Sequence, residues 1–479
     1  MSCFRYAFGA WALALFLVAC NGGAALSPGP SSGIANPGAS RLPHHGRTGS
    51  QQIQHVVIIM QENRSFNNLF MNFPGATTAT YGYDHKNRKI ALRPVSLSTA
   101  WDLAHNSQGF YSACNGTGSI PGTNCQMNGF DREPVTCGNA SQPVCPVKHP
   151  QYIYAPRSET APYWSMAKQY VLADQMFASN FDASSYVSHQ YIIAGQAGSA
   201  LNYPLTWWGC PGGSTDTVLT IAQSPPRGYG PRVTDCFDYT TLGDELDAAG
   251  VTWAYYAAPV GKGGSPCGQG AHGIGPGYVD GNGIWSAYQA VKHICYGPDW
   301  NNDVITPQTN FLNDVTAGKL RGVSWIVPTC ANSDHPGCSS STGPSWVASL
   351  VNAVGESQYW DSTAIFIMWD DYGGLYDPVA PQYLDYDGLG LRVPLIVVSA
   401  YAKQAYVSHI VYEHGSVLKF VEARFGLAPL AASDARANSP AQDCFDFSQS
   451  PRKFVPIKAP YGEGFFIRQR LDRRPPDAG

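Results

Sequence analysis

Five short apolar runs that alternate with helical stretches constrain the fold of this chain most strongly. Each run is rich in β-branched and aromatic residues, which favours a buried strand over a helix. The expected strands are residues 55–60, 251–256, 323–327, 364–369 and 394–399, and the expected helices are residues 161–178, 241–249, 346–354 and 415–425. This alternation predicts an α/β fold in which a mainly parallel sheet is sandwiched between helices.

The composition excludes two broad classes of protein. Hydrophobic residues make up 44% of the 479 residues and charged residues only 13%. A mostly disordered chain is excluded, because disorder requires few apolar residues and much charge. The net charge of −4 leaves no basic surface of the kind that nucleic acids require, so no nucleic-acid partner is expected.

The N-terminus resembles a bacterial export signal. Arg5 is the only charged residue among the first 40, and the apolar run Phe8–Ala19 is too short to span a bilayer. The run ends in Leu17-Val18-Ala19-Cys20, which is similar to a lipoprotein lipobox. That similarity implies cleavage of residues 1–19, lipidation of Cys20 and a lipid-anchored protein of the bacterial cell envelope, facing the periplasm or the outside. An ordinary signal peptide is the alternative.

The cysteine count also favours export. Setting aside Cys3 and Cys20 from the 13 cysteines leaves 11, most of them in loops rich in Gly, Pro and Asn. Disulfides fasten such loops in exported proteins, whereas a zinc site is less favoured because no CxxC pair occurs. The pairing is not deducible from the sequence, and the odd count predicts one unpaired cysteine.

Composition and motif positions divide the chain into segments. Residues 20–50 are rich in Gly, Ser and Pro and are interpreted as a flexible tether. Residues 51–430 are expected to form the functional domain, with loop insertions near residues 106–150 and 200–240. Residues 431–479 form a C-terminal extension, whose basic run at residues 468–474 is interpreted as a solvated tail.

Ionisable or polar residues follow four of the apolar runs, at the strand ends where open α/β sheets bind ligands. These residues are Glu62, Asn63, Asp334, His335, Asp370, Asp371, Glu413 and His414. Carboxylate and amide oxygens suit a divalent cation. Neighbouring carboxylates cannot all stay ionised without a compensating positive charge. The sequence therefore predicts one divalent metal cation of unspecified identity, with a solvated Asp-Asp turn as the alternative.

A serine at a helix start is a candidate nucleophile. The segment Asp182–His189 runs directly into the apolar stretch Gln190–Ala194. A hydroxyl group at a helix N-terminus lies in a positive field that favours phosphate. An ordinary serine N-cap is the alternative.

Together these motifs resemble a phosphoesterase family that contains bacterial phospholipases C and acid phosphatases, within the alkaline-phosphatase-like superfamily. The resemblance covers residues 53–427 and begins with Gln61-Glu62-Asn63-Arg64-Ser65-Phe66-Asn67. The following motifs occur in the family's order: Asp102-Leu103-Ala104-His105, Ser185 with His189, Asp334-His335-Pro336, Trp369-Asp370-Asp371, Gly373-Gly374, Arg392-Val393-Pro394 and Glu413-His414-Gly415-Ser416.

The resemblance implies a role for each matching residue. A divalent metal would be held by Glu62, Asn63, Asp370 and Asp371. Ser185 would be the metal-activated nucleophile, and Ser184 competes with it for that role. His105 and His335 would hold or protonate phosphate oxygens, and His414 is similar to a later histidine of the family's site.

Other residues of the motifs are interpreted as structural. His55 and His189 are expected to be hydrogen-bonded core or surface residues. Arg64 and Ser65 are expected to support the loop after the first strand rather than to contact substrate.

Three departures from the family pattern bear on the substrate. Asn67 replaces the usual Asp, Asp371 stands where many phospholipases have Glu, and Pro378 stands where a His often occurs. The Asp-Asp pair, and Ser instead of Thr as nucleophile, are similar to the acid phosphatase branch.

The expected function is that of a metal-dependent phosphoesterase with a seryl nucleophile, which cleaves phospholipids in the manner of a phospholipase C. An acid phosphatase acting on phosphomonoesters is the alternative, and an inactive envelope binding lipoprotein is the second alternative. The implied partners are a phospholipid or phosphomonoester substrate and the membrane, reached through the lipid anchor. The sequence does not predict the oligomeric state.

Overall fold

The computed structural model describes residues 49–137, 147–205, 208–260, 267 and 283–474. These described residues all belong to one compact unit. The expected signal peptide, Cys20 and nearly all of the expected tether lie outside the described residues. Within the described ranges, no helix combines the length and the apolar character that crossing a membrane requires.

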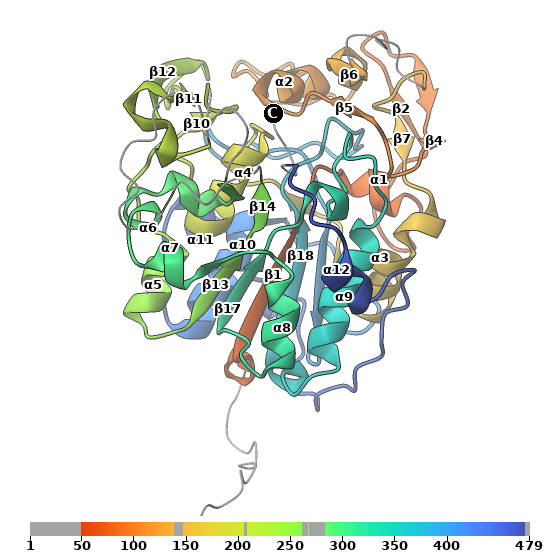
Figure 1. Ribbon diagram of the computed structural model, residues 1–479. Coiled ribbons are helices and arrows are strands. Elements are labelled where there is room, and N and C mark those ends of the chain that lie inside the picture. The colour runs from red at the N-terminus through yellow and green to blue at the C-terminus, as the bar shows by residue number, and fades with distance from the viewer. Residues whose placement is uncertain (1–48, 138–146, 206–207, 261–266, 268–282, 475–479) are drawn as a thin grey trace, which may run out of the picture. The chain divides into compact units, whose positions relative to one another are not determined.

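An eight-stranded sheet lies at the centre of this unit, in the order β16-β13-β17-β1-β18-β19-β8-β20 (Figure 1). Its strands are β1 (His55–Gln61), β8 (Val171–Ala173), β13 (Trp253–Tyr256), β16 (Val304–Ile305), β17 (Val323–Ile326), β18 (Thr363–Trp369), β19 (Leu395–Ser399) and β20 (Tyr406–Ser408). Strand β19 runs antiparallel to its neighbours β18 and β8, whereas every other pair is parallel. The predicted mainly parallel sheet is confirmed.

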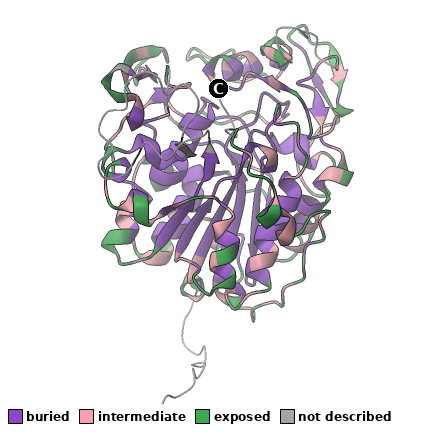
Figure 2. Cartoon of the chain, viewed as in Figure 1, coloured by how far each residue is buried: buried purple, intermediate pink, exposed green. Residues whose placement is uncertain are grey.

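Strand β1 occupies the middle of the sheet, between strands that come much later in the chain. Ile58 lies opposite Trp325 of β17 and Phe366 of β18. The residues Val56–Gln61 are all buried, and most of the central sheet is buried in Figure 2. Burial on both faces explains why the strands appear in the sequence as continuous apolar runs rather than as alternating patterns.

Helices cover both faces of the sheet. The helices of the described residues are α1 (Phe66–Phe70), α2 (Ser107–Cys114), α3 (Arg157–Gln169), α4 (Ser185–Ala194), α5 (Leu242–Ala248), α6 (Lys292–Cys295), α7 (Asp299–Asn302), α8 (Asn310–Thr316), α9 (Gly343–Gly355), α10 (His414–Phe425), α11 (Ala432–Arg436) and α12 (Glu463–Arg468). Helices α8, α9 and α12 lie on one face and α10 on the other (Figure 1). On the second face, Phe366 of β18 packs edge-on against Phe420 of α10, with ring centroids 4.9 Å apart.

The helix expected over residues 161–178 is wrong in its second half. Helix α3 ends at Gln169, and the backbone of Tyr170 leaves the helical region. The apolar run that follows pairs with β19 and β20 as strand β8. Placement between two strands therefore overrides the helical pattern of the flanking residues.

The described parts of both expected insertions lie beyond the carboxyl ends of the central strands, at the top of Figure 1. Strands β10 (Ala200–Leu201), β11 (Thr217–Ile221) and β12 (Tyr229–Thr234) form an antiparallel sheet there. The other minor sheets pair β2 (Tyr81–Tyr83) with β3 (Lys89–Ala91), β4 (Arg93–Pro94) with β7 (Ile153–Tyr154), β5 (Trp101–Leu103) with β6 (Val135–Cys137), β9 (Met176–Phe177) with β21 (Tyr412–Glu413) and β14 (Ala258–Val260) with β15 (Gly283–Trp285).

Disulfides fasten the loops, as the sequence predicts. The pairs are Cys114–Cys125, Cys210–Cys236, Cys267–Cys295 and Cys330–Cys338, and Cys137 is also disulfide-bonded. Among the described cysteines, Cys444 is the free one and it is buried. The expectation of one unpaired cysteine is confirmed for the described part of the chain.

The C-terminal extension packs on the functional domain. Phe466 of α12 lies 5.2 Å from Trp346 of α9, measured between ring centroids. Beyond α12, the side chains of Gln469 and Asp472 hydrogen-bond to the segment after β17. The interpretation of residues 468–474 as a solvated tail is therefore wrong for these two residues, because their polar side chains have partners in the protein.

Candidate active site

The loop after β1 sets the centre of the candidate site. Asn63 adopts a left-handed conformation with φ of 51°, and its backbone N–H donates to Asp370 Oδ1 at 3.0 Å. This bond ties the end of β1 to the end of β18, two strands that are neighbours in the sheet. The amide Nδ2 of Asn63 lies 3.1 Å from Asp371 Oδ2 and 2.9 Å from His105 Nε2.

Three carboxylates meet at this edge of the sheet. Glu62, Asp370 and Asp371 are fully buried. Burial, followed by the negative charge of Glu62, raises the pKa of Asp370 to about 7. Such a cluster requires a neutralising proton or a cation at neutral pH. The three carboxylates thus lie together after β1 and β18, where the sequence predicts them.

Ser185 is the first residue of α4, and its hydroxyl group faces the carboxylates. Its Oγ lies 3.4 Å from Glu62 Oε2, 3.5 Å from Asp371 Oδ2 and 3.4 Å from Asn63 Nδ2. Ser184 is the N-cap of α4, and its backbone N–H donates to Asp182 Oδ1 at 3.0 Å. Of the two serines that the sequence left open, Ser185 is the one hydrogen-bonded to Glu62 and Asp371.

His189 joins the same cluster, although it was interpreted from the sequence as a structural residue. Its Nε2 lies 3.3 Å from Glu62 Oε1 and 3.7 Å from Asp370 Oδ2. One atom from each of Glu62, His189 and Asp370 falls within 4.8 Å of the others. The sequence does contain an indication, because His189 follows Ser185 by four residues and shares its face of α4.

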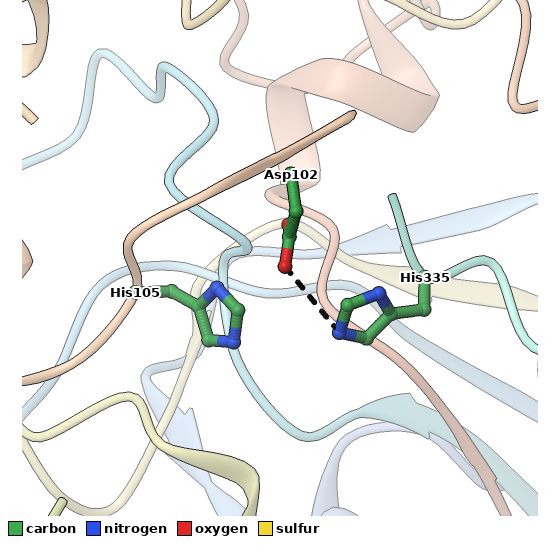
Figure 3. Close-up of side chains that lie close together, drawn as sticks. All are labelled: Asp102, His105 and His335. Carbon is green, nitrogen blue, oxygen red and sulfur yellow. Dashed lines mark ion pairs between the residues drawn. The ribbon is translucent and has the colours of Figure 1, made fainter. Parts of the chain in front are cut away.

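A second cluster consists of Asp102, His105 and His335 (Figure 3). The Nδ1–H groups of His105 and His335 donate to the carbonyl oxygens of Leu103 and Pro336. These bonds fix the tautomers, so that both Nε2 atoms face the site. His335 Nε2 lies 3.9 Å from Asp102 Oδ2, and the two imidazole rings meet edge-on with centroids 5.8 Å apart.

His414 is held by backbone groups instead. Its Nε2–H donates to Trp369 O at 3.1 Å, and its Nδ1 accepts the N–H of Ser179 at 3.5 Å. Burial lowers the pKa of His414 to about 4, so the ring is neutral at pH 7. His414 thus supports the backbone next to Asp370 rather than facing the two clusters.

Arg64 and Ser65 make the supporting contacts that the sequence suggests. The guanidinium of Arg64 donates from Nε to Asp334 O at 2.6 Å, and Ser65 donates to Tyr376 O and caps α1. Asn67, which stands in place of an Asp, exchanges hydrogen bonds with the backbone of Ala79. None of these three side chains hydrogen-bonds to a carboxylate of the Glu62, Asp370 and Asp371 cluster among the described residues.

The donor atoms fit a divalent cation. Asp370 Oδ2 and Asn63 Oδ1 are buried and accept no hydrogen bond from any described residue. Carboxylate and amide oxygens, together with an imidazole nitrogen from His189, form a donor set that borderline and hard divalent cations accept. The residues present therefore fit a metal.

Comparison with known proteins gives a consistent family. The model of the phosphoesterase family matches residues 53–428. A non-hemolytic phospholipase C of Pseudomonas aeruginosa is 27% identical over 428 residues, which cover 81% of this chain and 56% of that protein. Phospholipase C B of Mycobacterium tuberculosis is 22% identical over 470 residues, which cover 84% of this chain and 80% of that protein.

The chain spans about half the length of the first curated relatives that it matches. Among solved structures, a member of the alkaline phosphatase superfamily from Vibrio parahaemolyticus is 9% identical, with a TM-score of 0.33, and covers 82% of this chain and 72% of that chain. The family match spans most of the chain and both side-chain clusters, and the chain belongs to the phosphoesterase family.

Proposed function

We propose that this chain hydrolyses phosphate esters and that its reaction is phospholipase C-type cleavage of phospholipids. One observation carries the proposal: the Oγ of Ser185, at the start of a buried helix, lies within hydrogen-bonding distance of Glu62, Asn63 and Asp371. The relatives that bear the name phospholipase C support a phospholipid as substrate.

Glu62, Asn63, Asp370 and Asp371 would hold a divalent cation, and we propose His189 as a further ligand because it lies close to Glu62 and Asp370. When bound, such a cation supplies positive charge that offsets the buried carboxylates and stabilises the oxygens of the reacting phosphate. The positive end of α4 adds to this field at the position of Ser185.

Ser185 is proposed to attack phosphorus in line with the leaving alkoxide. Its proton passes to a carboxylate oxygen of Glu62 or Asp371, which are the nearest bases. The Oγ–P bond forms while the bond from phosphorus to the diacylglycerol oxygen breaks. Water then attacks the phosphoserine and releases the phosphorylated head group, which restores Ser185.

His105 and His335 present Nε2 atoms to the second side of the site. Protonated at Nε2, each ring keeps its Nδ1–H on a backbone carbonyl and can donate to a phosphate oxygen or to the leaving alkoxide. In the hydrolytic step the neutral Nε2 can accept the proton of the attacking water. His414 is assigned a positioning role, because both of its ring nitrogens bond to backbone groups.

An acid phosphatase is the second candidate. The observation that favours it is the Asp370-Asp371 pair, because the shorter arm of Asp371 is similar to the acid phosphatase branch. Ser185 attacks phosphorus in both cases. The candidates differ in the leaving group and in whether phosphorus keeps a second ester, so the acid phosphatase would release inorganic phosphate instead of a phosphorylated head group. We also propose that the chain is exported and lipidated at Cys20, which would bring the site close to either class of substrate.

Initial rates test the proposal. The purified chain and its Ser185→Ala and Ser184→Ala variants are assayed on phosphatidylcholine and on an aryl phosphomonoester, with a divalent cation and after chelation. We expect Ser185→Ala to lose about 1,000-fold or more, as for other nucleophiles, and Ser184→Ala to keep most of the rate.

The outcomes separate the candidates. Diacylglycerol release that is lost in Ser185→Ala and after chelation supports the phospholipase C. Turnover of the monoester alone would favour the acid phosphatase over the phospholipase C. Equal rates for the wild type and Ser185→Ala would refute the nucleophile, and no turnover of either ester would refute the proposed function.

A further inference from the structure

A disulfide closes the loop that carries His335, and hydrogen bonds attach this loop to the end of β1. The disulfide Cys330–Cys338 joins its two ends. Arg64 Nε donates to Asp334 O at 2.6 Å, and Gln61 Nε2 donates to Asn332 O at 3.2 Å. These bonds connect the inner side of the loop to the end of β1.

The outer side of the same loop is held by the end of the chain. Asp472 Oδ2 accepts the N–H of Ala331 at 2.9 Å, and Gln469 Oε1 accepts an N–H of the Asn332 side chain at 2.8 Å. At the other end of the loop, Arg474 donates to Cys338 O at 3.3 Å. We call residues 469–474 the C-terminal strap.

Charge and burial indicate that these contacts are built into the structure. The side chain of Asp472 is 14% exposed and forms an ion pair with Arg474 at 2.8 Å. Burial alone would raise the pKa of Asp472, but the hydrogen bonds from Arg474 and Ala331 outweigh it and lower the pKa. The start of the strap is fixed as well, because Phe466 packs against Trp346.

We propose that the C-terminal strap positions His335 in the active site, with Asp472 and Gln469 as positioning residues. The inference rests on the proposed function, in which His335 contacts the phosphate or its leaving group. The strap lies outside the segment 53–428 that the family model matches. It therefore supports one side of the site from outside the segment that the family model describes.

The physical reason is the way in which His335 is oriented. Its Nδ1–H is bonded to the carbonyl of the next residue, Pro336, so the ring follows the backbone of the disulfide loop. A shift of that backbone moves Nε2 relative to His105 and Asp102 (Figure 3). Misplacement of a catalytic group by about 1 Å costs on the order of 100-fold in rate.

The test combines kinetics with hydrogen exchange in the full chain. The variants are Asp472→Ala, the conservative Asp472→Asn, the matched control Arg470→Ala and Asp472→Ala combined with His335→Ala. Arg470 is exposed and, within the described residues, makes no hydrogen bond to the loop. Mass spectrometry follows amide exchange in the peptide that contains residues 330–338.

We expect Asp472→Ala to lower kcat by about 10- to 100-fold with little change in KM. Asp472→Asn keeps an oxygen that can accept the Ala331 N–H, so it should retain most of the rate. Arg470→Ala should behave as the wild type does. In the His335→Ala background, Asp472→Ala should add no further loss, because the residue acts through His335.

Defined outcomes of the kinetics and of the amide exchange would contradict the proposed role of the strap. The positioning role is overturned if Asp472→Ala lowers kcat equally with and without His335, or if kcat is unchanged while the loop exchanges faster. Unchanged exchange of the 330–338 peptide in Asp472→Ala would overturn the strap itself. If the wild type hydrolyses no phosphate ester, the proposed function and the catalytic role of His335 both fail, and exchange alone decides whether the strap orders the loop.

Discussion

A buried ion pair next to the candidate site allows the most stringent test of the physical reasoning. Arg392 and Asp377 are both fully buried, with Arg392 Nε 3.0 Å from Asp377 Oδ1. The guanidinium also donates to Asp377 Oδ2 at 3.1 Å and to the carbonyls of Asp174 and Thr77. Asp377 Oδ2 in turn accepts the N–H of Asn67 at 3.1 Å, which connects the pair to the loop after β1.

Replacing Arg392 by Met keeps an unbranched apolar side chain and removes every donor. Asp377 is then left as a buried carboxylate without a counter-charge. Breaking a buried pair in this way costs about 3–5 kcal/mol of unfolding free energy, a large part of the ~5–15 kcal/mol typical of a folded protein. Removing the second charge as well, in Arg392→Met/Asp377→Asn, should recover part of that loss.

The cost should depend on pH in a defined direction. Burial raises the pKa of Asp377 above 3.8 even though Arg392 opposes the shift, and removing Arg392 raises the pKa further. A carboxyl group whose pKa is higher in the folded than in the unfolded state stabilises the fold most when it is protonated. Its contribution to the free energy of unfolding therefore falls as pH rises through the folded pKa. The deficit of Arg392→Met relative to the wild type should therefore be larger at pH 7 than at pH 5.

Equilibrium unfolding in urea under non-reducing conditions measures these free energies for the wild type, both single variants and the double variant. We expect a coupling energy of about 2 kcal/mol between the two sites at pH 7. A loss of less than about 1 kcal/mol in Arg392→Met would refute the reasoning. So would a double variant that is no more stable than Arg392→Met.

Two further predictions concern backbone geometry and a surface histidine. Gly373 has φ of +62° and an added Cβ would lie 2.0 Å from Asn63 O, so Gly373→Ala should lower both the melting temperature and the affinity for a divalent cation by calorimetry. Gly426→Ala, at φ of +74° with nothing within 4 Å, should lower the melting temperature alone, and equal cation affinity in both variants would contradict the prediction. Burial lowers the pKa of His293, but its bonds to Asp238 and Asp244 outweigh this and raise the pKa above 6.5. The stability that the protonated His293 adds is present below pH 6.5 and is lost as pH rises through the folded pKa. His293→Gln should therefore lower the melting temperature more at pH 6 than at pH 9. A difference in melting temperature that does not depend on pH would contradict this prediction.

The sequence was sufficient for the parts of the fold that depend on local pattern. Strands such as β1 and β18 are buried on both faces, and their continuous apolar runs identify them without further information. The polar residues that follow these strands share one edge of the sheet, so Glu62 and Asp370 could be expected to meet. This expectation requires only the order of the motifs along the chain and the parallel direction of the two strands.

The sequence was insufficient where the outcome depends on side-chain direction or on distant partners. His189 has an apolar helical context, and only the packing of α4 against the end of β1 brings its Nε2 to Glu62. Residues 171–173 lie inside a helix-like pattern but complete the sheet. The contact of Asp472 with Ala331 joins segments that no motif connects.

The central position of β1 has a consequence for how the chain reaches its folded state. Val56 pairs with Val323 and His55 with Thr363, so the first strand of the domain cannot be paired until most of the chain is available. Contacts between residues so far apart in sequence make folding slow, because the loop between them must be closed first. During that interval an apolar strand has two open edges, which can pair with other chains. A chain that ends before Val323 is thus expected to aggregate rather than to fold.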